Sequence, residues 1–362
     1  MKPTDKPIDA GKTLAVSGIR PTQPALHLGN YFGALRQFLD LQEAYSGQCY
    51  FFVADLHSFA DVTDRETLAL NSLGVATEFL AAGLDPDRAT LFIQSDVPEL
   101  MAITWLLTGV ALDTQLLNLP HYRLKRDQFA MGQEVTGAPA LYLTYPILQA
   151  ADILAPAAHN DRILVPVGED QKPHIEFARE LVRRFNQRYG AILGLPDAYT
   201  RDDIHVRVKG LDGQEKMGKS QRNAVYLGDT PEEIRRLVRR GVTDPKRQRQ
   251  GDAGEPDECV GIYPLHQLTS TPAQLSHTIR PGCRSGALRC VECKAILSDN
   301  LVSQFSEFRE RKEDFSAHPE VVREIVAEGG KRARALAQAK LKEMSDAMGL
   351  SLSAEPRHLR SG

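Results

Sequence analysis

Short runs of β-branched and aromatic residues, each followed by a polar or glycine-containing turn and an amphipathic segment, recur along the first half of the chain. They lie at residues 14–17, 50–54, 90–93 and 163–167. The first three begin 36 and 40 residues apart, which leaves room for one crossover helix each. This spacing predicts an α/β fold with a parallel sheet and right-handed connections, in which ligands gather at the carboxyl ends of the strands.

The pattern changes twice further along the chain. From residue 98 to about 160 it is mostly helical, which we interpret as an insertion before the fourth strand. After residue 220 strand signals become rare, and Thr230-Pro231 followed by two glutamates is typical of a helix start. The predicted order is a flexible terminus at 1–12, an α/β domain at 13–227, an all-helical domain at 228–350 and a flexible tail at 351–362.

Composition limits the compartment in which the protein is expected and the partners that it is expected to bind. Its most apolar stretch, residues 138–158, is broken by Thr144, Gln149 and Asp152, so we expect no membrane span. The N-terminus lacks the apolar core of a secretory signal, which favours the cytoplasm. The net charge is −3, so RNA would have to meet a local basic patch, and DNA is not expected as a partner.

The first candidate site follows the first strand. Gly18 would let a ligand approach the backbone, and Gly29 removes a side chain where a flat purine could lie. His27 and Asn30 offer donors beside a helix N-terminus, which favours anions such as a triphosphate. The plain alternative is that His27 packs within a loop.

The second candidate is the loop at residues 211–220, which contains K-M-G-K-S. Lys216 and Lys219 on a glycine-containing loop can fold over a phosphate tail and stabilise charge on a departing pyrophosphate. A solvated pair of lysines is the alternative. The position of this loop after the α/β core and downstream of the H-x-G-N turn favours the phosphate interpretation.

The third candidate, Gly168-Glu169-Asp170-Gln171, comes directly after the fourth strand. Gly168 permits close approach, and an acidic side chain there could accept hydrogen bonds from ribose hydroxyls. Capping of the following helix is the competing role for either acid.

Four of the five cysteines lie within 35 residues of one another, and such clustering in a reducing compartment favours a metal over disulfides. Four thiolates can close a tetrahedral zinc site or hold an iron–sulfur cubane, and spacing cannot choose between them. Four unrelated core cysteines are the alternative, and Cys49 is expected to be core. The predicted metal ligands are Cys259, Cys283, Cys290 and Cys293.

With these motifs in this order, the chain resembles class I aminoacyl-tRNA synthetases. S-G-I-R-P-T at 17–22, Y-P-I-L-Q-A-A-D-I-L at 145–154 and V-P-V-G-E-D-Q at 165–171 resemble the bacterial tryptophanyl-tRNA synthetase family in particular. The resemblance implies a Rossmann-like catalytic domain and a homodimer that activates L-tryptophan with ATP and Mg²⁺ and transfers it to tRNA(Trp). The helical domain at 228–350 would bind the anticodon, and the cysteine pattern is similar to a 4Fe-4S subset of the family, which puts iron–sulfur before zinc.

The resemblance also implies roles for individual residues. The catalytic set would be His27, Asn30, Lys216, Lys219 and Ser220. ATP would meet Arg20, Gly29, Gly168, Asp170, Gln171, Lys216, Met217 and Lys219. Tryptophan would meet Asp152, Tyr145, Gln149, Val165, Val167, His57 and Gln171. Asp152 would accept the indole N–H, and a substrate lacking that donor would leave the carboxylate unpaired in an apolar slot, at a cost of several kcal/mol.

Two departures from the family pattern affect the expected activity. Gly218 replaces the first serine of the usual K-M-S-K-S, which predicts slower or weaker activation. Gln149 replaces a methionine of the indole pocket and makes that wall more polar. Three alternatives stay open: a tyrosyl-type ligase, a weakened paralogue acting as a redox-sensing or protein-binding module, and a small-molecule adenylyltransferase.

Overall fold

The structure is a computed structural model that describes residues 13–59, 61–130, 139–168, 171–200, 208–213, 217–218, 223–249 and 251–350. The termini predicted at 1–12 and 351–362 lie outside these residues. Within them, none of the helices combines the length and the apolar character that crossing a bilayer would require.

Five parallel strands form one sheet in the order β3-β2-β1-β4-β5. The four predicted strands are confirmed, while the edge strand β5 was missed because its short P-D-A-Y sequence lacks β-branched residues. The strands are β1 (Thr13–Ile19), β2 (Cys49–Val53), β3 (Ala89–Ile93), β4 (Arg162–Pro166) and β5 (Pro196–Tyr199).

Both faces of the sheet are covered, because successive side chains of each strand point to opposite sides. On β1, Leu14 and Val16 enter one core while Ala15 enters the other. On β2, Phe52 enters the first of these cores and Phe51 enters the second. The first core is completed by the insertion helices, α8 (Lys172–Tyr189) and α14 (Pro319–Ala347). The second is completed by α2 (Arg36–Ala44), α3 (Arg65–Ala81) and helices of the C-terminal half.

The first helices follow the α/β pattern, and four more lie where a helical insertion was expected. The first group is α1 (Leu28–Asn30), η2 (Tyr31–Leu35), α2 (Arg36–Ala44), α3 (Arg65–Ala81) and η3 (Gln94–Asp96). The insertion helices are α4 (Glu99–Thr108), α5 (Asp113–Asn118), α6 (Pro120–Ala130) and α7 (Leu141–Leu154).

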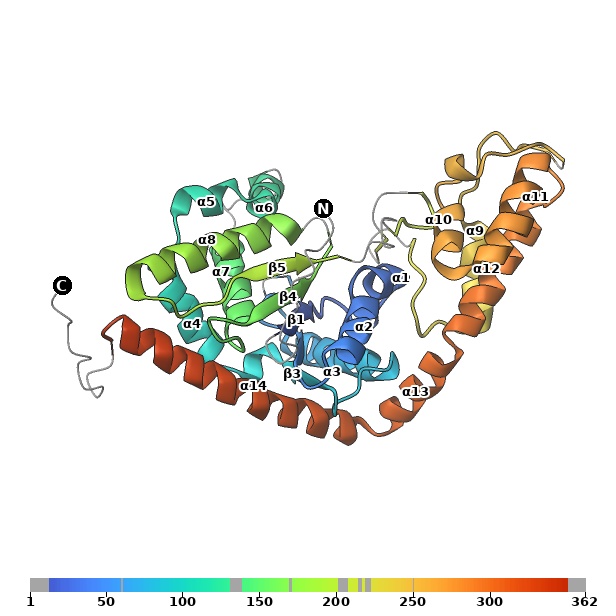
Figure 1. Ribbon diagram of the computed structural model, residues 1–362. Coiled ribbons are helices and arrows are strands. Elements are labelled where there is room, and N and C mark those ends of the chain that lie inside the picture. Colours follow the sequence, from blue (N-terminus) through green and yellow to red (C-terminus); the bar gives the residue numbers. More distant parts are fainter. Residues whose placement is uncertain are drawn as a thin grey trace.

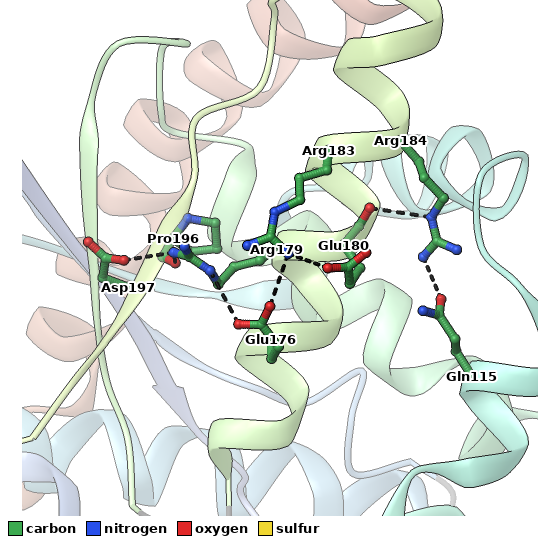
Figure 2. Close-up of polar contacts among 8 residues, drawn as sticks. All are labelled: Gln115, Glu176, Arg179, Glu180, Arg183, Arg184, Pro196 and Asp197. Carbon is green, nitrogen blue, oxygen red and sulfur yellow. Dashed lines mark hydrogen bonds and ion pairs between the residues drawn. The ribbon is translucent and has the colours of Figure 1, made fainter.

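Helix α8 (Lys172–Tyr189) fastens the edge strand and the insertion to one another (Figure 2). The Arg179 guanidinium donates to the Pro196 carbonyl and the Asp197 carboxylate, both at 2.7 Å. One turn further on, Arg184 donates to Gln115 of α5. These bonds tie α8 to β5 on one side and to the insertion on the other.

The C-terminal half is helical as predicted, and Thr230 caps α9 by accepting from the Glu233 N–H at 3.2 Å. Its elements are α9 (Pro231–Arg240), η6 (Pro256–Glu258), α10 (Tyr263–Thr269), η7 (Gln274–Ile279), α11 (Arg280–Ser285), α12 (Cys290–Gln304), α13 (Ser306–Ala317) and α14 (Pro319–Ala347).

The last helix, α14, returns to the α/β half and runs along it (Figure 1). A Cβ at Gly329 would lie 1.8 Å from the Leu91 carbonyl oxygen, so only glycine permits this contact between helix and strand β3. Ala333 and Ala337 enter the core of the sheet. Thus α14, expected within a helical domain at 228–350, packs on the α/β half because small residues allow close approach.

Candidate active site

Three residues of interest lie just beyond the carboxyl ends of strands in the sheet. His57 comes shortly after β2, Gln94 directly after β3 and Gly168 shortly after β4. Because the carboxyl ends of parallel strands meet at one edge of a sheet, these residues are brought to the same side of the molecule.

Asp152 lies at the centre of this group, in the last turn of α7. Its side chain is buried, and its carboxylate accepts from His57 Nε2 at 2.9 Å and from Gln94 Nε2 at 2.8 Å. Burial raises the pKa of Asp152, and the bonds from His57 and Gln94 oppose that rise only in part. A buried carboxylate between an aromatic base and an amide is suited to receive one further N–H donor.

Aromatic and imidazole rings form one wall beside Asp152. The Tyr145 ring packs edge-on against His57, with ring centroids 5.3 Å apart, and it also meets His121 and His174 at 4.9 and 5.2 Å. The structure therefore brings Tyr145 and His57 together, as the sequence predicted. Val165 and Val167 are buried in the core on the same face of the sheet.

Three buried polar atoms of this pocket have no hydrogen-bond partner among the described residues: Gln94 Oε1, His57 Nδ1 and Gln149 Oε1. Buried polar groups in native proteins are normally paired with protein, water or ligand. These atoms, two of which belong to the partners of Asp152, therefore mark this buried cluster as a candidate ligand site. Gln149 thus adds an unpaired amide oxygen, in line with the more polar wall that its sequence position predicted.

Sequence reasoning missed three residues of this pocket: Gln94, His121 and His174. Gln94 carried a usable signal, since it directly follows a predicted strand at the edge where ligands gather. His121 and His174 carried none, because only the packing of α6 and α8 brings their rings to Tyr145.

His27 and Asn30 hold each other at the start of α1. The Asn30 N–H donates to His27 Nδ1 at 3.3 Å, and the His27 N–H donates to Asn30 Oδ1 at 3.1 Å. This reciprocal cap fixes the turn. The cap occupies His27 Nδ1 and holds the imidazole ring at the N-terminus of α1.

The chain after the second motif lies beside this turn. The Leu28 N–H donates to the Val225 carbonyl at 2.9 Å, and the Leu227 N–H donates to the Leu26 carbonyl at 3.0 Å. A Cβ at Gly29 would lie 3.7 Å from Met217 Cβ. The two motifs are thus neighbours in space although they are far apart in sequence.

Gly218 is held by Asn223, whose Oδ1 accepts from the Gly218 N–H at 2.9 Å. Among the described residues, nothing lies within 4 Å of a Cβ placed at Gly218, so their packing leaves room for a serine there. Five predicted or discussed residues of this nucleotide side lie outside the described residues: Glu169, Asp170, Lys216, Lys219 and Ser220. Gly168 and Gln171 are described at the end of β4 and at the start of α8.

Two residues near the first motif, Gly18 and Arg20, have partners within the protein. A Cβ at Gly18 would lie 2.5 Å from the Phe52 ring, so this glycine makes room for the neighbouring strand and not for a ligand. Arg20 pairs with Asp61. Burial alone would raise the pKa of Asp61, but bonds from Tyr142 and Lys125 and the charge of Arg20 bring it to about 2.

The four predicted metal ligands are free thiols in the C-terminal half. Burial, with smaller contributions from the other three cysteines, raises the pKa of the Cys293 thiol to about 12. His266 Nε2 lies 3.3 Å from Cys293 Sγ. Within the described part of the chain, however, no three His, Cys, Asp or Glu side chains stand in an arrangement that could hold a metal ion. The donor chemistry suits a metal, while the geometry is not that of a formed site.

Comparison with known proteins places the chain in a family. Residues 9–306 match the family described as "tRNA synthetases class I (W and Y)". The tryptophan–tRNA ligase of Deinococcus radiodurans is 37% identical over 336 residues, covering 92% of this chain and 97% of the relative. That of Rhodopirellula baltica is 40% identical over 323 residues, covering 89% and 95%.

Solved structures agree with these relatives. The tryptophanyl-tRNA synthetase of Campylobacter jejuni, complexed with ADP and tryptophan, matches with a TM-score of 0.76 and 30% identity, over 93% of this chain and 99% of that one. The enzyme of Mycoplasma pneumoniae matches with a TM-score of 0.76 and 28% identity, over 94% and 98%. By sequence and by fold, the chain belongs to the tryptophanyl-tRNA synthetase family of class I aminoacyl-tRNA synthetases.

Proposed function

We propose that this enzyme activates L-tryptophan with ATP and transfers the tryptophanyl group to tRNA(Trp), releasing AMP and pyrophosphate. The observation that carries the proposal is the buried Asp152 carboxylate, which accepts hydrogen bonds from His57 and Gln94. The Tyr145 ring packs against His57, and the group lies at the edge of the sheet where the first motif also lies. Members of this family use ATP with Mg²⁺ for this reaction.

In the proposed first step, the tryptophan carboxylate attacks the α-phosphorus of ATP and pyrophosphate leaves. Asp152 accepts the indole N–H and sets the depth of the side chain. His27, Lys216 and Lys219 stabilise the growing charge on pyrophosphate, which is electrostatic catalysis that needs no covalent intermediate on the protein. In the second step a ribose hydroxyl of the tRNA displaces AMP.

Amino-acid-dependent exchange of labelled pyrophosphate into ATP tests this proposal. Exchange should depend on tryptophan and be far weaker with tyrosine, because a phenol lacks the indole N–H. Exchange stimulated by tyrosine alone would overturn the assignment of Asp152. An inactive protein that still binds partners through its cysteine-rich half would favour the weakened paralogue instead.

The helical residues 228–317 are proposed to contact tRNA. Helix α9 presents several arginines, of which Arg235 and Arg236 are paired with Asp299 and Glu233. Such a basic face supports phosphate contact. Tryptophan acceptance by tRNA should then fall steeply with salt while tryptophan-dependent exchange changes little, and equal salt dependence of the two activities would contradict this role.

We further propose a homodimer formed through the insertion helices. Met101 and Trp105 lie one turn apart on α4 with exposed fractions of 51% and 76%, which is unusual for large apolar side chains on a monomer. Trp105 is the only tryptophan of the chain, so its fluorescence should shift to the blue as protein concentration rises. The Trp105→Glu variant should be a monomer in light scattering, and a variant that still dimerises would place the interface elsewhere.

The four cysteines are proposed to close around a 4Fe-4S cluster, with zinc as the second choice. Two observations support this assignment. All four cysteines are free thiols, and charges on the other cysteines contribute to raising the pKa of Cys283 and of Cys293. Free thiols of this kind also fit a reducing compartment such as the cytoplasm. Protein purified without oxygen should be brown and contain iron, and Cys293→Ser should lose it. A colourless protein with neither iron nor zinc would remove the proposal.

A further inference from the structure

Helix α3 holds the loop that precedes His27 along one of its faces. Asn71 Nδ2 donates to the Pro21 carbonyl at 3.1 Å, and the Leu26 N–H donates to Glu78 Oε2 at 2.5 Å. Between them, a Cβ at Gly74 would lie 2.4 Å from the Pro24 carbonyl oxygen. Because these α3 residues recur at helical spacing, they form one surface against which the loop is fixed.

Glu78 is the unusual member of this surface, since its carboxylate is completely buried. Burial raises its pKa, while the charge and hydrogen bond of Lys312 and the bond from the Leu26 N–H oppose the rise. A buried carboxylate without a cation is strongly destabilising, so Glu78 depends on its partner. Lys312 Nζ lies 2.5 Å from Glu78 Oε1.

The partner comes from the far end of the chain. Lys312 belongs to α13, the helix that precedes α14, and its side chain passes over Gly228, where a Cβ would lie 2.5 Å from Nζ. Gly228 directly follows Leu227, which is bonded to the Leu26 carbonyl. Lys312 thus meets both segments that flank the turn. Lys312 also borders a cavity of about 620 Å³ lined by residues 23–25, Tyr226 and Arg240.

We propose that Lys312 and Glu78 are positioning residues for adenylate formation. Through Glu78, the ammonium group of α13 fixes the Leu26 N–H and with it the capped turn that carries His27 at the ATP side. The placement of a C-terminal helix is therefore coupled to the nucleotide site and not to the tryptophan pocket. This inference rests on the proposed function, and wild-type exchange with tryptophan must be measured first.

Removal of the cation tests the coupling. In Lys312→Met the KM for ATP in the exchange reaction should rise about tenfold while the KM for tryptophan stays within about twofold, because small displacements at a reacting group are costly. Lys312→Arg should restore the ATP value. The matched control is Arg311→Met, since Arg311 lies next in the same helix and donates to the Ala81 carbonyl of α3 at 2.9 Å without touching Glu78.

A double variant separates positioning from stability. Glu78→Leu with Lys312→Met removes both charges, so the melting temperature should recover relative to Lys312→Met. The KM for ATP should stay raised, because replacing Glu78 removes the acceptor of the Leu26 N–H. Recovery of both quantities, or an equal rise of the two KM values in Lys312→Met, would show that the pair is merely structural. Loss of exchange in the wild type would instead overturn the proposed function.

Discussion

The proposed tryptophan pocket and the proposed nucleotide side of this enzyme are built in opposite ways. The pocket around Asp152 is made by strand ends and insertion helices of one half, and its hydrogen bonds join side chains that are buried together. The nucleotide side is a turn held by backbone bonds from residues 225–227 and by Lys312 through Glu78. The residues proposed to select tryptophan thus come from one half of the molecule, while those proposed to bind ATP depend on segments from both halves.

The largest effect is expected at the centre of the pocket. Asp152→Ala should lower kcat/KM for tryptophan about 1,000-fold and leave the KM for ATP nearly unchanged, because only the amino acid loses a buried partner. Exchange kinetics with each substrate varied in turn measure both. The exposed Asp113→Asn serves as control, and parallel losses for ATP and tryptophan would mean that the two sides are not separate.

The same carboxylate should make tryptophan binding depend on pH. Burial raises the pKa of Asp152, with His57 and Gln94 opposing the rise and Asp55 adding to it. A carboxylate accepts an N–H more strongly than a carboxyl group, so the KM for tryptophan should rise as pH falls toward this raised pKa. Asp152→Asn should flatten that limb of the profile, and an unchanged limb would assign it to another group.

On the nucleotide side, His27→Asn should reduce the rate of adenylate formation about 100-fold while the KM for tryptophan is little changed. Asparagine is a good N-cap residue, so the turn should survive and the loss should report the imidazole itself. Single-turnover measurements would report the loss of the imidazole, and thermal melting would report any loss of the cap. A large fall in melting temperature would show that histidine is mainly a cap.

Gln94→Leu should have an intermediate effect of about tenfold on kcat/KM for tryptophan, because Asp152 keeps His57 but loses its amide donor. Exchange at a series of tryptophan concentrations gives this value. The same substitution should also weaken rejection of tyrosine. If the KM for ATP changed instead, Gln94 would act at the nucleotide side and not in the proposed tryptophan pocket.

The smallest change is expected for Gly218→Ser, which restores the hydroxyl of the usual motif. None of the described residues occupies the space at this position, so the variant should fold normally and lower the KM for ATP by about threefold, the value of one added hydrogen bond. Steady-state exchange measures it. A rise in the KM for ATP would mean that the backbone at Gly218 already meets the phosphate.

Local patterns in the sequence were sufficient for much of the fold. The first four strands are confirmed because their apolar runs and turns follow directly from side-chain alternation and chain punctuation. The edge strand β5 was missed because an edge can be formed by residues without strand preference. Gln94 could have been found from its place after β3, whereas His121 and His174 could not.

Neighbours along the chain are enough to predict the α/β order, the strand ends that carry polar residues and the cap at Thr230. It took the folded molecule to show that α14 packs on β3, that Met217 lies beside Gly29, and that Lys312 reaches Glu78. These contacts join residues far apart in the chain, and their energies depend on burial and close approach, which exist only once the halves have packed together.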